Sequence, residues 1–313
     1  MILSNTASFH PRNKHQGRYD FEKLAQQHPP LKTYLKTTSD KKKSDEATID
    51  FSDANAVKAL NQALLMTQYQ ISFWDIPDGY LCPPIPSRAD YIHRVGDLIA
   101  VNGSPTSKLV QALDIGMGAN CIFPLLGHRA YGWKFVGADI DSTALRTAKG
   151  LVQANDLAKA IKCRLQLNAE HIFHDIIKDT EIFDLVVCNP PFHSSEEKAK
   201  TASKRKWKNL GKNPNTGFNF KGKSSELAYP GGERAFVSKM IEESQDYKEQ
   251  VLWFTSLISN KKHLDNLQKQ IEYFKARFKV LEMQHGQKQS RILAWTYANE
   301  SKELKWKKQI FKD

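Results

Sequence analysis

Cysteine and long apolar runs are scarce in this sequence, and each shortage excludes a class of protein. The four cysteines are far apart and form no Cys-x-x-Cys pair, which argues against a disulfide framework or a zinc site. We therefore expect no bound metal. No apolar run approaches the roughly 20 residues of a membrane span, and the first eight residues lack the charged start and apolar core of a signal peptide. We expect a cytoplasmic protein with no membrane contact.

Positive charge is what the chain has in excess. Its 46 Lys and Arg outnumber 34 Asp and Glu, which gives a net charge of +12 at pH 7 and a pI near 9.3. This balance favours a polyanionic partner such as nucleic acid, although a basic protein without such a partner is the alternative. At 313 residues, with 40% hydrophobic side chains, the chain can form one large domain or two modest ones.

Short apolar runs alternate with helical patterns from residue 109 onward. This alternation predicts an α/β fold of Rossmann-like type, with a mostly parallel, doubly wound sheet. An antiparallel pair should close the sheet at 278–283 and 292–297. The predicted parallel strands are 109–115, 133–140, 161–167, 182–188 and 250–258, and the predicted helices of this region are 142–155, 231–247 and 261–274.

Residues 1–105 are predicted to form a small N-terminal extension that is basic and helical and binds RNA. An apolar stripe at helical spacing predicts a helix from Asp53 to about Tyr69. A proline-rich segment at 82–86 should be extended, with Ser87 capping the next helix. We place the Rossmann-like domain at 106–313.

The stretch from Asp184 to Phe192 organises the chain. Its apolar run predicts a buried strand, which must stop at Asn189-Pro-Pro-Phe192. Proline cannot donate to a sheet ladder, and it disfavours helix in the residue before it. The Asn side chain and the free carbonyls are thereby left at the carboxyl end of a strand, where α/β sheets bind ligands. An ordinary strand-ending turn is the alternative.

These four residues suit the methylation of a planar amine, whose lone pair is delocalised into its ring. The Asn189 side-chain oxygen and the Pro190 carbonyl could accept both amine hydrogens, so that the lone pair points at a methyl group. Pro191 stiffens the turn, and Phe192 would stack on a base that has left its own stack. The predicted catalytic residues are therefore Asn189, Pro190, Pro191 and Phe192.

A glycine turn follows the first predicted strand, within Leu113-Asp-Ile-Gly-Met-Gly-Ala-Asn-Cys121. Gly116 and Gly118 let the backbone approach a ligand closely. The third glycine of a dinucleotide fingerprint is absent, because position 121 is cysteine. Asp114, just before the turn, fits S-adenosylmethionine instead, because a carboxylate attracts its sulfonium and amino groups. A packing turn without a ligand is the alternative.

Further candidate cofactor contacts follow the next two predicted strands. Asp139 lies about 20 residues beyond the glycines, where a carboxylate commonly binds ribose hydroxyls. Asp141 competes with it but could instead cap the following helix, and we favour Asp139 because it ends the strand. Asn168 and Ala169 are placed to border an adenine ring, although a plain loop explains them at least as well. The cofactor contacts predicted from the residues are Asp114, Gly116, Gly118, Asp139 and Asn168.

These motifs resemble the S-adenosylmethionine-dependent class I methyltransferases, in which Asn-Pro-Pro-Phe/Tyr marks amine methylation. The similarity is closer to the bacterial large-subunit ribosomal RNA adenine-N6 methyltransferase F family, and it covers nearly the whole chain. The stretches that carry it are His10-Pro-Arg-Asn-Lys-His-Gln-Gly-Arg-Tyr-Asp20, Trp74-Asp-Ile-Pro-Asp-Gly-Tyr-Leu-Cys-Pro-Pro84, Arg88-Ala-Asp-Tyr-Ile-His93, the region 114–126, Gly231-Gly-Glu233 and Gly286-Gln-Lys-Gln-Ser-Arg291.

The resemblance implies transfer of a methyl group from S-adenosylmethionine to N6 of one adenine in 23S ribosomal RNA. The RNA would be presented free or in a pre-50S particle, and we expect a monomer. It also implies that Arg88 binds the carboxylate of the cofactor. Two departures matter: many relatives have Glu where this chain has Asp139, and the stretch between Phe192 and Gly231 varies among relatives.

A long basic loop follows the predicted catalytic motif. Between His193 and Tyr229 lie nine Lys or Arg and three Asp or Glu, with Trp207, Phe218 and Phe220 interleaved. Its length exceeds the usual limit of about 12–15 residues. We interpret it as an RNA clamp, with cations for phosphates and rings for unstacked bases; a solvated insertion is the alternative. The predicted RNA contacts are Arg12, Lys14 and Arg18 near the N-terminus, Lys204, Arg205, Lys206 and Lys208 in the loop, and Lys288 and Arg291 beyond it.

Two other functions stay open from the sequence. A protein-glutamine methyltransferase needs the same two acceptors for its amide nitrogen, but such enzymes usually have Tyr where this chain has Phe192, and the basic loop disfavours a protein substrate. A non-catalytic RNA-binding factor for ribosome assembly could also use a methyltransferase fold. The intact set of Asp114, Asp139 and Asn189 argues against that second alternative.

Overall fold

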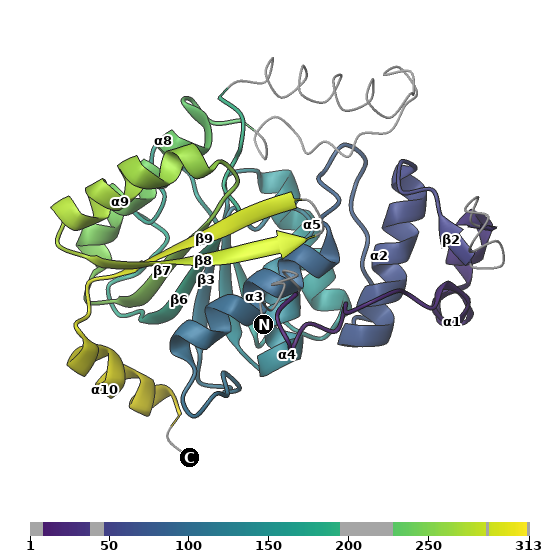
Figure 1. Ribbon diagram of the computed structural model, residues 1–313, viewed down its shortest axis with the longest axis horizontal. Helices are drawn as coiled ribbons and strands as arrows, with labels where there is room; N and C mark the ends of the chain where they lie inside the picture. The colour runs from purple at the N-terminus through teal and green to yellow at the C-terminus, as the bar shows by residue number, and fades with distance from the viewer. Residues whose placement is uncertain (1–8, 38–46, 195–227, 286–287, 312–313) are drawn as a thin grey trace, which may run out of the picture.

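A seven-stranded sheet forms the centre of the molecule. The computed structural model describes residues 9–37, 47–194, 228–285 and 288–311, and the side chains of 284–288 are outside this description. The strand order is β5-β4-β3-β6-β7-β9-β8 (Figure 1). The strands are β3 (Gln111–Ile115), β4 (Lys134–Asp139), β5 (Ile161–Leu165), β6 (Phe183–Cys188), β7 (Val251–Ile258), β8 (Arg277–His285) and β9 (Lys288–Thr296).

The pairing confirms the predicted mostly parallel sheet with an antiparallel closing pair. Strands β3 to β7 pair in parallel, whereas β9 is antiparallel to both β7 and β8. Every residue of β6 and β7 is buried. Continuous apolar runs of this kind are typical of strands that are covered on both faces.

Two helical layers cover the sheet. Successive residues of a strand face opposite sides, and β6 follows this rule: Leu185 and Val187 belong to one hydrophobic cluster, Val186 and Cys188 to the other. The first cluster includes residues of α3 (Ile85–Ile99), α4 (Ile122–Tyr131) and α5 (Ser142–Ala154). The second includes residues of α8 (Gly232–Glu243) and α9 (Leu264–Tyr273).

A smaller unit with its own core lies beside the sheet (Figure 1). It consists of α1 (Phe21–Gln27), a 3-10 helix (Pro29–Tyr34), β1 (Leu35–Thr37), β2 (Ala47–Ile49) and most of α2 (Ala54–Tyr69). Asp53 caps α2 by accepting from the backbone N–H of Asn55. The C-terminal part of α2 and all of α3 pack on the sheet core. The division at residue 105 remains a prediction.

The start of α3 differs from the sequence expectation. The helix begins at Ile85 with Pro84 as its N-cap, so Ser87 lies inside the first turn instead of capping it. Proline is tolerated in the first turn, because the N–H that it lacks has no helical partner there. The helix therefore extends three residues further toward the N-terminus, and Arg88 becomes its fourth residue.

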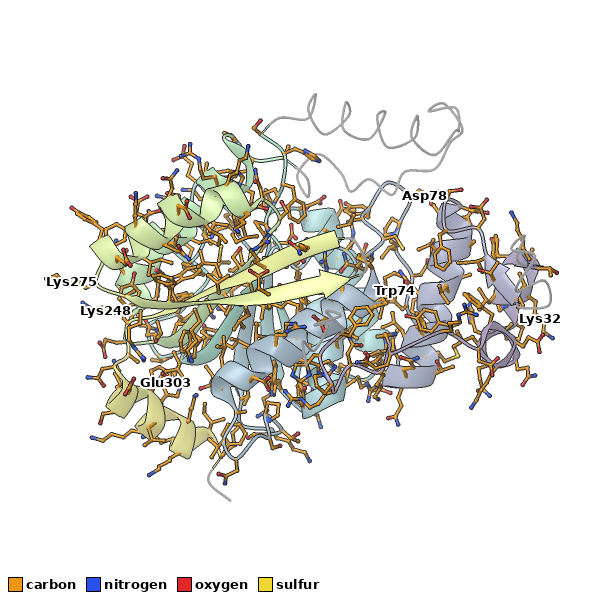
Figure 2. The ribbon with its side chains drawn as sticks, in the orientation of Figure 1. Lys32, Trp74, Asp78, Lys248, Lys275 and Glu303 are labelled. Carbon is orange, nitrogen blue, oxygen red and sulfur yellow. The ribbon has the colours of Figure 1, made fainter. Side chains whose placement is uncertain are left out.

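A C-terminal helix, α10 (Glu300–Ile310), was not predicted. Its Trp306 Nε1 donates to Asp184 Oδ1 at the start of β6, at 2.7 Å. Its Glu303, labelled in Figure 2, accepts from Arg277 of β8 at 2.9 Å. Within the described ranges, no helix is both long and apolar enough to cross a membrane.

Candidate active site

A cavity lies at the carboxyl ends of β3, β4 and β6. The chain runs from β3 outward to β4 and β5, then returns to β6 on the other side of β3. Such a reversal in strand order leaves a crevice where α/β sheets bind ligands. Of the predicted site residues, those that line the cavity are Arg88, Gly116, Gly118, Asp139, Asn189 and Pro191.

The glycine turn has the backbone conformation that requires glycine. Gly116 has φ +71° and Gly118 φ +62°, a region that costs other residues about 1–2 kcal/mol. The backbone N–H of Gly116 and that of Met117 both donate to the carbonyl of Ala138, at 2.9 and 3.0 Å. Trp74, labelled in Figure 2, donates Nε1 to the carbonyl of Asn120 at 2.9 Å. The turn is therefore held from β4 and from the segment before α3.

Asp114 and Arg88 are buried opposite charges beside the cavity. Asp114 is 1% exposed and Arg88 7% exposed. Neither carboxylate oxygen of Asp114 has a hydrogen-bond partner among the described residues. Burial raises the pKa of Asp114 well above its usual value, Asp139 raises it further, and Arg88 opposes the shift. Burial lowers the pKa of Arg88 to about 10. This pair matches a zwitterionic amino-acid group, with an anion for Arg88 and an ammonium for Asp114.

Asp139 and Asp141 have separate tasks. Asp139 Oδ2 accepts from Gly118 N and its Oδ1 from Asp141 N, each at 2.8 Å. Burial raises the pKa of Asp139, and these backbone donors oppose that shift. Asp141 caps α5 through Thr143 N at 2.8 Å and also accepts from the Tyr80 hydroxyl at 2.8 Å. Of the two carboxylates, Asp139 is the one that lines the cavity.

The loop after β5 approaches the cavity through residues other than Asn168. Asn168 is exposed, and its Oδ1 accepts from Glu170 N at 3.0 Å. Its neighbours Gln166 and Ala169 line the cavity. Gln166 was missed from the sequence, since a single buried glutamine after a strand carries no distinguishing pattern.

The end of β6 presents an acceptor without a partner. Asn189 Oδ1 is buried and has no hydrogen-bond partner among the described residues. Tyr91 of α3 holds the strand end, because its hydroxyl accepts from Cys188 N at 3.3 Å and lies 2.7 Å from Thr255 Oγ1. Pro190 is buried, and Phe192 packs half-buried against the sheet core; neither lines the cavity.

The two ends of the basic loop meet beside this motif. His193 and Ala228 form a parallel bridge, and Tyr229 N donates to the His193 carbonyl at 3.0 Å. Ala228, Tyr229 and Phe236 add to the cavity wall. The predicted RNA contacts within the loop, Lys204, Arg205, Lys206 and Lys208, lie outside the described residues.

The other predicted RNA contacts do not form one group. Arg291 is 7% exposed, and its guanidinium donates to Glu282 and Gln289. For Lys288, only the backbone at the start of β9 is described. Lys14 donates Nζ to the Gln68 carbonyl at 2.6 Å. Lys14 and Arg18 line a second hollow together with Lys23 of α1, whereas Arg12 is bonded to the body of the protein.

In the part of the chain that the structure describes, no three His, Cys, Asp or Glu residues are placed to hold an ion. Arg88 and Asn189, with its open acceptor, line one cavity, and the carboxylate of Asp114, which has no hydrogen-bond partner among the described residues, is buried just before the glycine turn of that cavity. This set fits an amino-acid group and an amine.

Comparison with known proteins shows relatives along almost the whole chain. The chain is 48% identical to "Ribosomal RNA large subunit methyltransferase F" of Pseudomonas putida strain GB-1, over 98% of each chain. It is 46% identical to the protein of that name in Pseudomonas aeruginosa strain UCBPP-PA14, over 97% of this chain and 92% of the relative.

Two solved structures share the fold. The hMettl16 catalytic domain in complex with the MAT2A 3′UTR hairpin 1 superposes with a TM-score of 0.79 at 30% identity, over 94% of this chain and 96% of that one. The N-terminal domain of human METTL16 in complex with SAH superposes with a TM-score of 0.73 at 27% identity, over 93% of this chain and 99% of that one. A family profile described as RNA methyltransferase matches residues 3–299. This protein therefore belongs to the RNA methyltransferase family.

Proposed function

We propose that this methyltransferase transfers a methyl group from S-adenosylmethionine to N6 of one adenine in 23S ribosomal RNA. The observation that carries the proposal is the buried Asn189 Oδ1, which lacks a hydrogen-bond partner among the described residues and belongs to the cavity wall. Leaving a buried acceptor unpaired costs about 1–3 kcal/mol, and an incoming adenine amine would satisfy it. The names of the Pseudomonas relatives and the hMettl16 hairpin complex support RNA as the substrate class.

The cavity residues fit the cofactor. When bound, S-adenosylmethionine supplies an electrophilic methyl group on a sulfonium. Arg88 would bind its carboxylate and Asp114 its ammonium, and in each case a buried charge gains the partner of opposite sign. Asp139 would accept from the ribose hydroxyls, while Gly116 and Gly118 leave room for the ligand at the turn.

The Asn-Pro-Pro-Phe turn would hold the target amine. Asn189 Oδ1 and the Pro190 carbonyl accept its two hydrogens, which directs the nitrogen lone pair toward the methyl group. No strong general base is required, because positioning and electrostatics supply the acceleration. Phe192, whose ring is fixed by packing on the sheet core, would stack on the flipped base.

RNA would also contact the basic N-terminal surface and the loop after the catalytic turn. The hollow lined by Lys14, Arg18 and Lys23 offers three cations to phosphates. Lys204, Arg205, Lys206 and Lys208 would add contacts from the loop. We further propose that the protein acts as a monomer in the cytoplasm, on free 23S RNA or on a pre-50S particle.

The direct test is methyl transfer to defined RNA. Protein is incubated with methyl-labelled S-adenosylmethionine and ribosomal RNA from a strain that lacks the gene, and the labelled nucleoside is mapped. We expect ribonuclease-sensitive label in N6-methyladenosine at one position. Label that protease releases would instead support a glutamine methyltransferase, and calorimetry without cofactor binding would support a non-catalytic factor.

Gly232 should be needed for catalysis through its closeness to the catalytic turn. It has φ +69°, and a Cβ there would lie 3.2 Å from Ser194 N and 3.4 Å from the Phe192 carbonyl oxygen. Gly232→Ala should therefore displace this backbone and lower kcat by about tenfold, since small misplacements of a reacting group are costly. The KM for S-adenosylmethionine should stay unchanged in steady-state assays.

Gly103→Ala is the matched control for backbone strain. Gly103 has φ +79°, but a Cβ there would meet nothing within 4 Å. Both variants should lose the stability that backbone strain costs, about 1–2 kcal/mol, and Gly232→Ala should lose more because of its close contact with Ser194. An equal loss of kcat in both would show that strain alone, and not closeness to Phe192–Ser194, explains the effect.

A further inference from the structure

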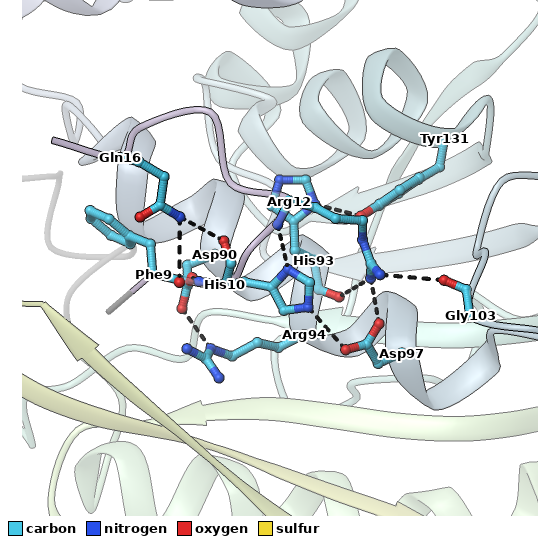
Figure 3. Close-up of polar contacts among 10 residues, drawn as sticks. All are labelled: Phe9, His10, Arg12, Gln16, Asp90, His93, Arg94, Asp97, Gly103 and Tyr131. Atoms are coloured by element: carbon cyan, nitrogen blue, oxygen red, sulfur yellow. Dashed lines mark hydrogen bonds and ion pairs between the residues drawn. The ribbon is translucent and has the colours of Figure 1, made fainter. Parts of the chain in front are cut away.

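The segment 9–16, here called the N-terminal strap, is bonded along one helix of the methyltransferase domain (Figure 3). The backbone N–H of His10 donates to Asp90 Oδ1 at 2.5 Å, and His10 Nε2 lies 3.0 Å from Asp97 Oδ2. Asn13 Nδ2 donates to the Pro86 carbonyl at 3.0 Å. The strap therefore contacts α3 from its first turn to its last.

Arg12 makes two hydrogen bonds to α3 and one to the end of α4. Its guanidinium donates to the His93 carbonyl at 3.2 Å, to the Tyr131 hydroxyl at 2.8 Å and to the carboxylate of Asp97 (Figure 3). Its backbone N–H donates to His10 Nδ1 at 3.1 Å, and the other ring nitrogen of His10, Nε2, is the one that faces Asp97. Arg12 thus binds the protein itself, and its contact with RNA stays a prediction.

The contact of His10 with Asp90 is buried and that of Asn13 with Pro86 is partly buried, so both are costly to break, whereas the Asp97 side chain is 50% exposed. Asn13 is 2% exposed, His10 8% and Asp90 fully buried. Asp90 is also bonded to Arg94 at 2.7 Å. Removing one partner from a buried polar network leaves the others unsatisfied, at about 1–3 kcal/mol for each group. The strap is therefore built into the fold.

The opposite side of α3 faces the active site. An α-helix turns about 100° per residue, so the strap contacts at Pro86, Asp90 and Asp97 lie about 160–200° around the axis from Arg88. Arg88 lines the cavity from that other side. Tyr91, also away from the strap, holds Cys188 at the end of β6. If the strap contacts were lost and α3 moved, Arg88 would therefore move with it.

We propose that the N-terminal strap positions Arg88, so that Asn13 and Arg12 are positioning residues for cofactor binding. The proposal rests on the proposed function in one respect, namely that Arg88 binds the carboxylate of S-adenosylmethionine. It gives Asn13 and Arg12 a role different from the RNA contacts proposed for the exposed Lys14 and Arg18 of the same region. Loss of the strap contacts would weaken binding of the amino-acid group of the cofactor before it weakens binding of the adenosine.

Asn13→Asp tests this with little change in shape. The aspartate keeps the acceptor for His15 N, which Asn13 Oδ1 holds at 3.0 Å, but it turns an oxygen instead of a donor toward the Pro86 carbonyl. S-adenosylhomocysteine carries the amino-acid group, and 5′-methylthioadenosine lacks it. By calorimetry we expect the Kd for S-adenosylhomocysteine to rise about tenfold and the Kd for 5′-methylthioadenosine to change less than twofold, because only the first ligand reaches Arg88.

Arg88→Ala separates failure of this proposal from failure of the proposed function. If Arg88→Ala leaves the ratio of the two Kd values unchanged, Arg88 does not bind the carboxylate and the assigned cofactor contact is wrong. If Arg88→Ala changes the ratio but Asn13→Asp does not, the strap proposal is overturned. In the double variant, Asn13→Asp should add nothing to the ratio, because coupled residues are non-additive.

Two further variants keep the test decisive. Arg12→Lys retains the charge but loses the guanidinium fork, so it should change the Kd ratio in the same direction even if Asn13→Asp folds poorly. Gln26→Ala, on the exposed side of α1, should leave both Kd values unchanged. Equal weakening of both ligands in Asn13→Asp and Arg12→Lys would indicate general loss of structure and would count against the strap as a positioning element.

Discussion

Alanine at position 189 should lower the rate of methyl transfer to RNA by about 10²–10³-fold, the usual cost of removing one aligned polar group from a transition state. The Asn189 side chain provides the acceptor that the amine hydrogens require, and its Oδ1 is buried without a partner among the described residues. Cofactor affinity should change little, because Arg88, Asp114 and Asp139 are untouched. Single-turnover rates at saturating RNA, with Kd values for S-adenosylhomocysteine, measure the two effects separately.

Two further substitutions define what the amide contributes. Asn189→Asp keeps an acceptor at the same place and should retain more activity than Asn189→Ala. Asn266→Ala removes an exposed amide on α9 and should have no effect. Full single-turnover activity of Asn189→Ala would remove the assigned role of Asn189 and the main support for amine methylation.

The centre of the site could be predicted because its signals are local. Pro190 and Pro191 end β6 in any context, since proline cannot continue a ladder. Asp139 ends β4 and lines the cavity, whereas Asp141 caps α5, which is the other role that the sequence allowed for it. The parallel order of the sheet follows from alternating strand and helix patterns.

Residues brought in by tertiary contacts could not be found in this way. Tyr91 reaches the end of β6 from a helix nearly one hundred residues earlier, and Gln166 enters the cavity wall from an ordinary loop. The basic stretch at 10–18 suggested nucleic-acid contact by composition alone, yet Arg12 is bonded to α3 and α4. Composition shows how many basic side chains a segment has, but only the folded structure shows which of them are already bonded to a carboxylate, as Arg12 is to Asp97.

Asp114→Asn should weaken S-adenosylmethionine binding by about 10–100-fold and, at the same time, stabilise the protein without ligand. The affinity loss follows because hydrogen bonds to charged groups contribute about 1.5–3 kcal/mol, and the amide offers no charge to the ammonium. The stability gain follows because Asp114 is buried without a hydrogen-bond partner among the described residues. Relieving such a group contributes about 1–3 kcal/mol. Calorimetry and thermal unfolding measure the two effects.

The pH dependence of the stability gain tests its cause. Burial raises the pKa of Asp114 in the folded protein, above the value near 3.9 of an unfolded chain. Such a group stabilises the fold fully below its unfolded pKa, and this stabilisation is lost as pH rises through the folded pKa. Asn does not titrate, so the melting temperature of Asp114→Asn should exceed that of the wild type more at pH 8 than at pH 5. Asp265→Asn, at an exposed position on α9, serves as the control.

Saturating ligand should reverse the order of stability. S-adenosylhomocysteine carries the ammonium that pairs with Asp114, so it binds and stabilises the folded wild type more than the variant. The wild type should then melt above Asp114→Asn at pH 8, although it melts below it without ligand. A variant that is less stable in both conditions would mean that the Asp114 carboxylate is already paired within the protein. A variant that is more stable both with and without ligand would mean that Asp114 does not bind the cofactor. Only a reversal, in which Asp114→Asn melts above the wild type without ligand and below it with ligand, supports Asp114 as a cofactor contact.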